Sequence, residues 1–383
     1  LLADPASVCW ALNIRGSDVP YTPFPLAYAL LRRKGKAELF ADIARLTPDA
    51  RKALKDIVQC KPPVDLPSRL AALAGKTVAL DPALAPDAAR LALVKAGAKV
   101  IEAQDPCVLP KARKNETERQ GARAAQRRDG GALTRFLKWV SENAANGSHS
   151  EATAAEKLRE LRSESNMLRG LSFESISASG PNAAIPHYHL SPDDARPLAA
   201  GEIYLIDSGG QYLDGTTDVT RTVMIGTPTG EMRDRFARVL KGMIALSVLR
   251  FPKGTTGAHI DALARAALWK AGLDFDHGTG HGVGSYLSVH EGPARISKAG
   301  HTALEPGMIL SNEPGYYKAG AFGIRIENLL LVTEATEIEG GDRPMLGFET
   351  LTFAPIDRAL IDARLLTREE LLWLNAYHAR VLE

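Results

Sequence analysis

The segment Glu202-Ile-Tyr-Leu-Ile-Asp207 and the segment Thr217-Asp-Val-Thr-Arg-Thr-Val-Met-Ile225 decide the fold of the larger part of this chain. Both are rich in β-branched and aromatic residues, and the Gly-rich turn Ser208-Gly-Gly210 follows the first, so we expect an antiparallel pair of strands. Each segment carries an aspartate, Asp207 or Asp218, in an apolar context. A carboxylate that faces the core of a sheet is costly without a partner, so both aspartates need one.

Around this pair, strand-like and helical segments are grouped and do not strictly alternate, which predicts an α+β domain. We expect amphipathic helices at 231–249 and 258–271 and a last helix at 367–381. Strand-like segments dominate the region 308–353. No internal repeat and no low-complexity tract is present in the sequence.

Residues 1–112 have a different pattern, in which strands and helices alternate. A short apolar strand is expected at 76–80, a helix at 87–95 and a second strand from residue 100, which together make one βαβ unit. A single βαβ unit leaves sheet edges exposed. We therefore expect this part to belong to a larger α/β domain whose beginning lies outside the sequence.

The boundary between the two domains is placed in the strongly charged stretch Lys111–Arg128, so that residues 113–383 form the second domain. Within this stretch, acidic and basic residues alternate from Lys111 to Arg119, which is typical of a solvated helix face and not of a nucleic-acid patch. Helical patterns then run to about residue 146 and again from 151 to 168.

The composition excludes several classes of protein. The chain has 383 residues, of which 45% are hydrophobic and 24% charged, as in ordinary globular proteins. Its net charge of +2 is too small to indicate nucleic-acid or membrane-surface binding, and no apolar stretch approaches the roughly 18 residues of a membrane span. Cys9, Cys60 and Cys107 are too scattered for a disulfide framework, so we expect buried thiols in a reducing, cytoplasmic compartment.

Five groups with metal-ligand chemistry occur in or beside strand-like segments of the second domain: Asp207, Asp218, His281, Glu313 and Glu327. Taken singly, each carboxylate is better explained as a strand-end or ion-paired residue. Four of them together in apolar β segments indicate a shared cation site. Glu327 lies within the strand-like segment Gly323–Val332, where strand alternation places Arg325 and Glu327 on one face.

The segment His277-Gly-Thr-Gly-His-Gly-Val-Gly284 has two histidines at the spacing of a zinc-binding helix, but its glycines argue against a helix. No strand is expected to lead into it and no suitable helix follows, which argues against a dinucleotide-binding loop. The segment is therefore predicted to be a loop in which the backbone and the imidazole of His281 approach a ligand closely. His290 and His187 are further imidazoles that could act with it.

The charge of this set favours two cations over one. Four carboxylates are balanced by two divalent ions, whereas a single Zn²⁺ would leave two negative charges in a buried site. Structural zinc sites also prefer Cys and His ligands. An oxygen-rich shell with one imidazole favours Mn²⁺, with Co²⁺ or Zn²⁺ as alternatives. Such a pair of ions would activate water and polarise a carbonyl group.

These residues, together with Asn312-Glu-Pro-Gly-Tyr-Tyr317 and Gly323-Ile-Arg-Ile-Glu-Asn328, resemble the "pita-bread" dinuclear metallopeptidases. That fold is shared by methionine aminopeptidase, prolidase, aminopeptidase P and the non-metal creatinase. Xaa-Pro aminopeptidases (aminopeptidase P) of the cytosolic type are the most similar, on the loop between His281 and His290 and on the C-terminal stretch Leu346–Ile356. The resemblance covers nearly the whole chain.

The resemblance implies an α+β pita-bread catalytic domain in residues 113–383, with a C-terminal extension at about 343–383. It implies that residues 1–112 are the later part of a middle, creatinase-type α/β domain. The first of three domains is expected to be absent.

The resemblance also implies a function and a role for each residue. The expected reaction is metal-dependent hydrolysis of the N-terminal Xaa-Pro bond of peptides that carry proline second, with two divalent metal ions as cofactors. The expected metal ligands are Asp218 and Glu327, which bridge, with Asp207, His281 and Glu313, and Glu313 is also expected to shuttle the proton. His187 and His290 are expected to stabilise the reacting carbonyl and to place the proline. His277 is expected to be a substrate-side residue, and Arg325 is expected to orient Glu327 or a nearby carboxylate.

Two other functions stay open at this point. A prolidase would cut only Xaa-Pro dipeptides and would recognise the free carboxylate of the substrate. A non-catalytic binding protein on this fold would be expected to lose one or more of the five ligands, and none is lost here. The segment Trp373–Tyr377 also has two interpretations, as the surface of a homodimer or as a terminal helix packed on its own domain.

Overall fold

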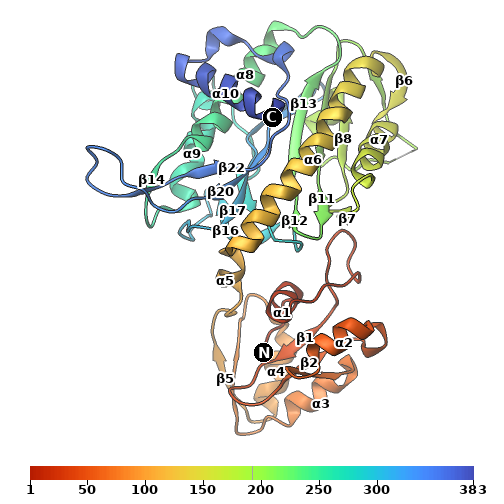
Figure 1. Ribbon diagram of the computed structural model, residues 1–383, viewed down its shortest axis with the longest axis vertical. Coiled ribbons are helices and arrows are strands. Elements are labelled where there is room, and N and C mark those ends of the chain that lie inside the picture. The colour runs from red at the N-terminus through yellow and green to blue at the C-terminus, as the bar shows by residue number, and fades with distance from the viewer. Residues whose placement is uncertain (192) are drawn as a thin grey trace. The chain divides into compact units, whose positions relative to one another are not determined.

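The computed structural model describes residues 1–191 and 193–383, and the chain divides into two compact units, 1–111 and 112–383 (Figure 1). Each unit has hydrophobic clusters of its own. Within the described ranges, no helix has the length and apolar character needed to cross a bilayer.

The first unit contains two small sheets. In one, β1 is antiparallel to β2 and β2 is parallel to β3; in the other, β4 and β5 are parallel and α4 connects them. The predicted strand, helix and strand of the βαβ unit are therefore confirmed. The elements are α1 (Pro5–Leu12), β1 (Tyr28–Leu30), β2 (Ala37–Phe40), α2 (Pro48–Leu54), β3 (Val58–Lys61), α3 (Leu66–Ala71), β4 (Thr77–Leu80), α4 (Asp87–Lys95), β5 (Lys99–Glu102) and, at the unit's end, α5 (Val108–Ala112).

The three cysteines lie in this unit as free thiols, as expected. Cys9 and Cys107 are buried, and Cys60 is half-buried. Burial raises the pKa of the Cys9 and Cys107 thiols to about 12, so both stay protonated and unreactive at neutral pH.

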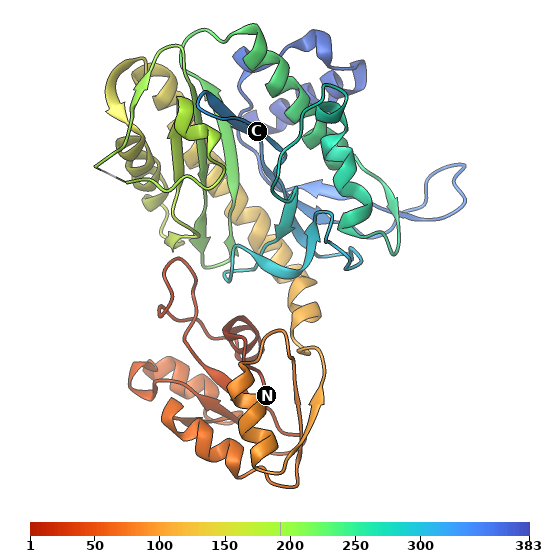
Figure 2. The ribbon, with the colours of Figure 1, turned by 180° about the vertical axis from the view of Figure 1, so that it is seen from behind.

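The second unit has its helices on the outside of several sheets. The predicted helices near 231–249, 258–271 and 367–381 are confirmed, but the helix predicted for 151–168 ends at Ser163, because Leu168–Leu171 pairs with another strand. The helices are α6 (Glu116–Asn143), α7 (Glu151–Ser163), α8 (Gly230–Ser247), α9 (Gly257–Trp269) and α10 (Arg368–Leu382). Seen from behind, α8 (green) and α9 (teal) lie side by side (Figure 2).

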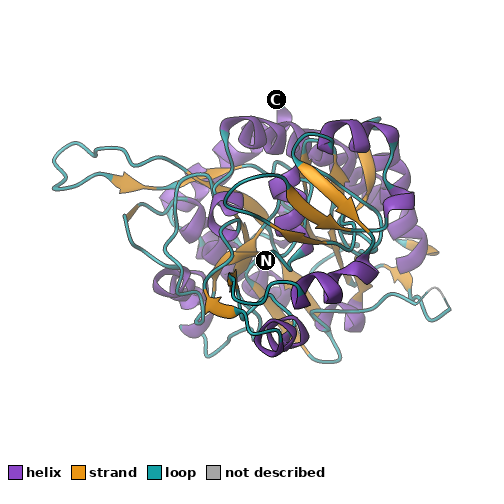
Figure 3. Cartoon of the chain, turned by 90° about the horizontal axis from the view of Figure 1, so that it is seen from below, coloured by secondary structure: helices purple, strands orange, loops and turns teal. Residues whose placement is uncertain are grey.

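The strands of this unit are short and loops join most of them (Figure 3). They form sheets in the orders β13-β10-β8, β12-β11-β7 and β16-β15-β17-β20-β22, with further pairs β18-β19, β14-β21 and β6-β9. Their bounds are β6 (Asn146–Ser150), β7 (Leu168–Leu171), β8 (Ile176–Ser179), β9 (Pro197–Ala199), β10 (Ile203–Ser208), β11 (Gly210–Tyr212), β12 (Gly215–Thr216), β13 (Val219–Met224), β14 (Phe251–Pro252), β15 (Gly280–Gly282), β16 (Glu291–Ile296), β17 (Ile309–Asn312), β18 (Gly315–Lys318), β19 (Phe322–Arg325), β20 (Asn328–Val332), β21 (Met345–Leu346) and β22 (Phe348–Thr350).

The predicted antiparallel pair is present as β10 and β13, in a register that puts Asp207 opposite Thr220. The prediction of a simple Gly-rich turn between them is wrong, because β11 and β12 form a second hairpin there. Every residue of β10 is buried. On one face Tyr204 and Ile206 pack on α6 and α7. On the other, Ile203 packs on α8 and Leu205 packs on Ala178 and Ala183, so the apolar run before Asp207 is covered on both faces.

The stretch that leads into α6 differs from the predicted solvated face. Lys111 and Lys114 are buried, and the Lys114 Nζ atom lies 2.5 Å from Glu291 Oε1 on β16. This stretch of alternating charge therefore includes one residue of a buried ion pair, whose partner lies 177 residues away in sequence.

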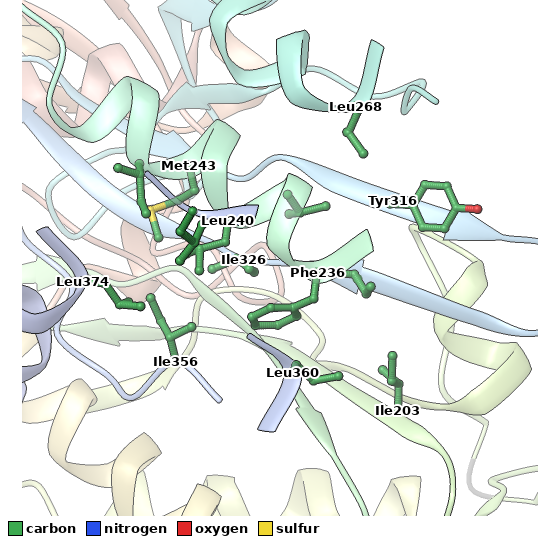
Figure 4. Packing of buried hydrophobic residues seen from close by; sticks show 14 of the residues in the cluster. Ile203, Phe236, Leu240, Met243, Leu268, Tyr316, Ile326, Ile356, Leu360 and Leu374 are labelled. Carbon is green, nitrogen blue, oxygen red and sulfur yellow. The ribbon is translucent and has the colours of Figure 1, made fainter. Parts of the chain in front are cut away.

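The largest apolar cluster among the described residues surrounds α8. Phe236, Leu240 and Met243 of α8 project between the strand that leads to Ile326 and the C-terminal segment, as Figure 4 shows. Leu374 and Tyr377 of α10 belong to the same cluster. The terminal helix thus packs on its own domain, which is one of the two interpretations of its aromatic face.

Arg221 connects this C-terminal helix to the middle of the unit. Its guanidinium is 1% exposed and donates hydrogen bonds to the Glu327 carbonyl (2.6 Å), the Ala354 carbonyl (3.0 Å) and the Tyr377 hydroxyl (2.8 Å). A buried guanidinium needs several acceptors, and here they come both from α10 and from the segments on which it packs.

Replacing Phe236 by Ala should lower the free energy of unfolding by about 3–5 kcal/mol, because a fully buried aromatic ring is replaced by a cavity. Leu372→Ala, on the exposed face of α10, is the control and should change it by less than about 0.5 kcal/mol. Urea unfolding followed by circular dichroism measures both, and similar losses for the two variants would contradict this account of the core.

Candidate active site

The five predicted metal ligands come from five separate places in the second unit and line one cavity of about 480 Å³. Asp207 lies on β10, His281 on β15, and Asp218 immediately before β13. Glu313 and Glu327 lie in the breaks between β17 and β18 and between β19 and β20. The same cavity is lined by the other four predicted site residues: His187, His277, His290 and Arg325.

His281 is directed at the carboxylates through its Nε2 atom. This atom lies 3.4 Å from Asp218 Oδ2 and 3.3 Å from Glu313 Oε1. The other ring nitrogen, Nδ1, is 2.9 Å from the Gly282 carbonyl, which fixes it as the donor and leaves Nε2 free to bind a cation. Ligand atoms of Asp218, His281 and Glu327 all lie within 4.8 Å of one another.

The loop predicted around His281 is wrong in part, because Gly280–Gly282 is a strand in the middle of a sheet. A Cβ atom at Gly280 would lie 2.0 Å from the Ser311 carbonyl, so only glycine lets β15 approach β17 this closely. Ser311 in turn accepts a hydrogen bond from the His281 N–H (3.0 Å) and donates one to Glu313 (2.9 Å). Glycine is therefore needed here because two strands approach each other closely. The glycine pattern in the sequence cannot show whether the close neighbour is a strand or a ligand.

The segment 323–332 is likewise two strands and not the single one predicted. Arg325 ends β19, and the chain passes through Glu327 into β20, which belongs to another sheet. Both side chains nevertheless reach Thr220 on β13: its Oγ1 donates to Glu327 Oε2 (2.8 Å) and accepts from Arg325 Nε (3.1 Å). The guanidinium also forms an ion pair with Asp207 at 2.5 Å, so Arg325 orients Asp207 directly.

Two carboxylate oxygens of this cluster are buried without a hydrogen-bond donor, Asp207 Oδ1 and Glu327 Oε1. Buried anionic oxygens are rarely left in this state unless a cation binds them. Together with the Nε2 atom of His281, they are the kinds of donor that divalent transition ions prefer. The residues present therefore fit a divalent metal centre.

The electrostatics of the cluster lead to the same conclusion. Burial raises the pKa values of Asp218, Glu313 and Glu327 above their ordinary range, and the negative charges of their neighbours add to the effect. Burial alone would lower the pKa of His281, but its hydrogen bond to Asp218 and the charge of Glu313 raise it instead. The cluster consequently retains protons unless positive charge is supplied.

A hydrogen-bonded chain along one wall of the cavity includes a residue that the sequence did not single out. Tyr317 OH accepts from Arg325 Nη1 (2.6 Å) and lies 2.8 Å from His277 Nε2. Burial, with the charge of Arg325 adding to it, lowers the pKa of His277 to about 4, so its imidazole is neutral. Thr220 lies two residues after Asp218, and this strand-like alternation was the available signal for it, whereas Tyr317 was marked only by its place in the Asn312–Tyr317 motif.

The remaining two histidines lie toward the opening. The ring of His290 is 4.2 Å from that of His281, centroid to centroid, in an edge-on arrangement. Burial, together with the charge of His281, lowers the pKa of His290 to about 4. His187 is exposed and lines the cavity on a segment between β8 and β9. The imidazole of His290 can therefore offer a neutral N–H to a bound molecule.

Comparison with known proteins identifies three family models along the chain. The model for metallopeptidase family M24 matches residues 120–334, that for the creatinase/prolidase N-terminal domain matches 1–118, and that for the C-terminal region of the same peptidases matches 344–383.

The chain is also similar to individual members. It is 45% identical to a probable Xaa-Pro aminopeptidase P of Paracoccidioides brasiliensis over 98% of this chain and 64% of the relative, and 47% identical to one of Laccaria bicolor over 97% and 59%. A solved structure, the X-prolyl aminopeptidase from Caenorhabditis elegans, a cytosolic enzyme with a di-nuclear active site, is similar with a TM-score of 0.92 and 39% identity. That match covers 99% of this chain and 63% of the other. The chain thus spans less than two thirds of the length of these relatives.

Binding of divalent metal should release protons at pH 7, because the metal-free cluster holds protons on His281 and on carboxyl groups with raised pKa values, and ligands must be deprotonated. The affinity for Mn²⁺ should accordingly increase as the pH rises from 6 to 8. Calorimetric titration in buffers of different ionisation enthalpy measures the protons released. An affinity independent of pH, with no proton release, would contradict the assignment of these groups as ligands.

Proposed function

We propose that this chain, which belongs to metallopeptidase family M24, hydrolyses the N-terminal Xaa-Pro bond of peptides and releases the first residue. The observation that carries the proposal is the convergence of five ligand side chains with His187 and His290 in one cavity. The relatives named Xaa-Pro aminopeptidase support the choice of reaction within the family.

In this proposal two divalent ions would be held by Asp207, Asp218, His281, Glu313 and Glu327, and Asp218 and Glu327 are the proposed bridging ligands. Mn²⁺ is the proposed native ion, because oxygen ligands dominate the set, with Co²⁺ and Zn²⁺ as alternatives. Such ions, when bound, lower the pKa of water and polarise a carbonyl group. The chain supplies the orientation: the Gly282 carbonyl fixes His281 and Arg325 fixes Asp207.

Glu313 is proposed to move the proton. Its Oε1 accepts a hydrogen bond from Ser311 and faces His281, so the carboxylate is held at the edge of the cluster, where it can take a proton from water and pass it to the leaving nitrogen. Burial raises the pKa of Glu313 to about 7 in the metal-free protein, which supports this proposed role.

His187 and His290 are proposed to act on the substrate itself. Each can donate a hydrogen bond to the charge that develops on the carbonyl oxygen, and the pair would place the proline ring between them. An Xaa-Pro bond has no N–H, so the site cannot rely on the strand-like backbone pairing that many peptidases use. His277 is proposed as a substrate-side group held by Tyr317, and the free α-amino group is proposed to lie near the carboxylates.

We further propose that residues 113–383 are the catalytic domain, that about 343–383 are its C-terminal extension, and that residues 1–112 belong to a separate α/β domain. A cytoplasmic location is proposed from the cytosolic relative of Caenorhabditis elegans and from the free thiols. A homodimer is proposed as the oligomeric state, with Trp373, which is partly exposed beside Tyr377, at its surface.

The full chain loaded with Mn²⁺ should cleave Arg-Pro-Pro between arginine and proline and should not cleave Arg-Ala-Ala at a comparable rate. Mass spectrometry of the products measures both reactions. Turnover restricted to the dipeptide Arg-Pro, with none of the tripeptide, would favour a prolidase. Absence of turnover of any of these peptides by metal-loaded protein would contradict the proposal.

Asp218→Asn should bind less metal than the unchanged protein and lose activity by more than about 100-fold. Mutating a residue that only supports a metal ligand typically lowers metal affinity or activity by 10- to 100-fold, and the loss of a ligand itself should be larger. The matched control is Asp214→Asn. Asp214 lies in the β11–β12 hairpin and forms an ion pair with Arg128 of α6, so this variant loses an ion pair outside the cavity. Metal content by elemental analysis and the thermal midpoint show whether the loss is local. Full metal and full activity in Asp218→Asn would refute the ligand assignment.

A further inference from the structure

Glu151 is a buried carboxylate that has no part in the chemistry proposed above. It is the first residue of α7, where Ser150 is the N-cap, and its exposed fraction is 0%. An ionised carboxylate at such a depth needs strong compensation. The N-terminus of a helix provides part of it, because the free N–H groups there favour negative charge.

The rest of the compensation comes from one segment of the chain. Four uncharged donors, all within residues 179–196, bind the two carboxylate oxygens: Ser179 N (2.6 Å), Asn182 Nδ2 (3.1 Å), Tyr188 OH (3.1 Å) and Arg196 N (2.9 Å). Hydrogen bonds to an ionised acceptor are about twice as strong as those between neutral groups. A single side chain thus holds this segment at four points.

His187 lies inside this segment, next to the anchored Tyr188. Apart from the short 3-10 turn Gly180–Ala184, the described residues between β8 and β9 have no regular structure that could fix the imidazole. The turn itself packs on the strand that carries Arg325, since a Cβ atom at Gly323 would lie 1.7 Å from the Ala183 carbonyl. The segment is therefore fixed to the cavity wall at its beginning, and near His187 by the carboxylate.

We propose that Glu151 is a positioning residue that holds His187 at the opening of the active-site cavity. The inference rests on the proposed function, in which His187 acts on the substrate. Glutamine is the informative replacement, because it keeps the shape of the side chain but removes the charge and turns an amide N–H₂ toward groups that are themselves donors. At least one of the four contacts must then be lost.

The test is a double-mutant cycle in the full chain loaded with Mn²⁺, with Glu151→Gln, His187→Ala and the double variant acting on Arg-Pro-Pro. Glu151→Gln should lower kcat/KM by roughly 10- to 100-fold, as a displacement of about 1 Å does. If Glu151 acts through His187, the double variant should be no slower than His187→Ala. Effects that multiply in the double variant, or an unchanged rate in Glu151→Gln, would overturn the proposal.

Glu202→Gln is the matched control, because Glu202 also binds this segment, through Ser179 Oγ and Arg196 Nη2, but not next to His187. It should change kcat/KM by less than about twofold, and a loss as large as that of Glu151→Gln would overturn the specific role of Glu151. If Glu151→Gln fails to fold, Tyr188→Phe removes one of the four donors and should show the same coupling to His187 on a smaller scale.

A second measurement does not depend on activity. Hydrogen exchange of the amides in 185–191 should become faster in Glu151→Gln and stay unchanged in Glu202→Gln. If the wild-type protein cleaves none of the peptides, the proposed function fails, and the exchange rates still decide whether Glu151 holds the segment. Unchanged exchange in Glu151→Gln would overturn the proposal in either case.

Discussion

The cost of gathering four carboxylates in one buried cavity is the constraint on which the rest of the second unit depends. Asp207, Asp218, Glu313 and Glu327 repel one another and are screened little by water, as the raised pKa values of three of them show. The fold meets this cost with one guanidinium, one imidazole and hydroxyl donors, and it leaves two oxygens without a donor. The pair of divalent cations proposed for this site would complete the balance of charge, and the two oxygens without a donor separate this arrangement from an ordinary ion-pair network.

Three of the four histidines that line the cavity share a second property: His187, His277 and His290 each lie on a segment that a buried charge holds. Arg265 of α9 donates to the His277 carbonyl (2.8 Å) and is itself paired with Asp261. His290 precedes Glu291, whose carboxylate is paired with Lys114 at the start of α6. Glu151 has the corresponding position for the segment of His187. Buried charges stabilise a fold poorly in comparison with apolar groups of the same size, but the directions of their hydrogen bonds restrict the backbone that they bind.

The sequence predicted which residues meet in the cavity because each one stands in a local motif, and it predicted the long amphipathic helices because their periodicity is strong. It predicted less where the information is not local. The three-residue strand β15 has two glycines and no strand propensity, and only its neighbours define it as a strand. Lys114 is surrounded by alternating charges and its partner Glu291 lies far along the chain, so nothing nearby indicates that the pair is buried. Glu151 stands at the start of a helix, where acidic residues are common. Its role in holding the segment 179–196 therefore cannot be inferred from its local sequence.

Arg221 has a consequence for how the protein matures. The carbonyl of Glu327 and the hydroxyl of Tyr377 bind the same guanidinium, so α10 contributes to fixing the backbone of the proposed ligand Glu327, some fifty residues earlier in the chain. On the ribosome, α10 is the last of the described helices to be synthesised. A nascent chain that still lacks this helix already contains the acceptors of Arg221 on residues 220, 327, 328, 354 and 355, so the Tyr377 hydroxyl is the last of them to be added.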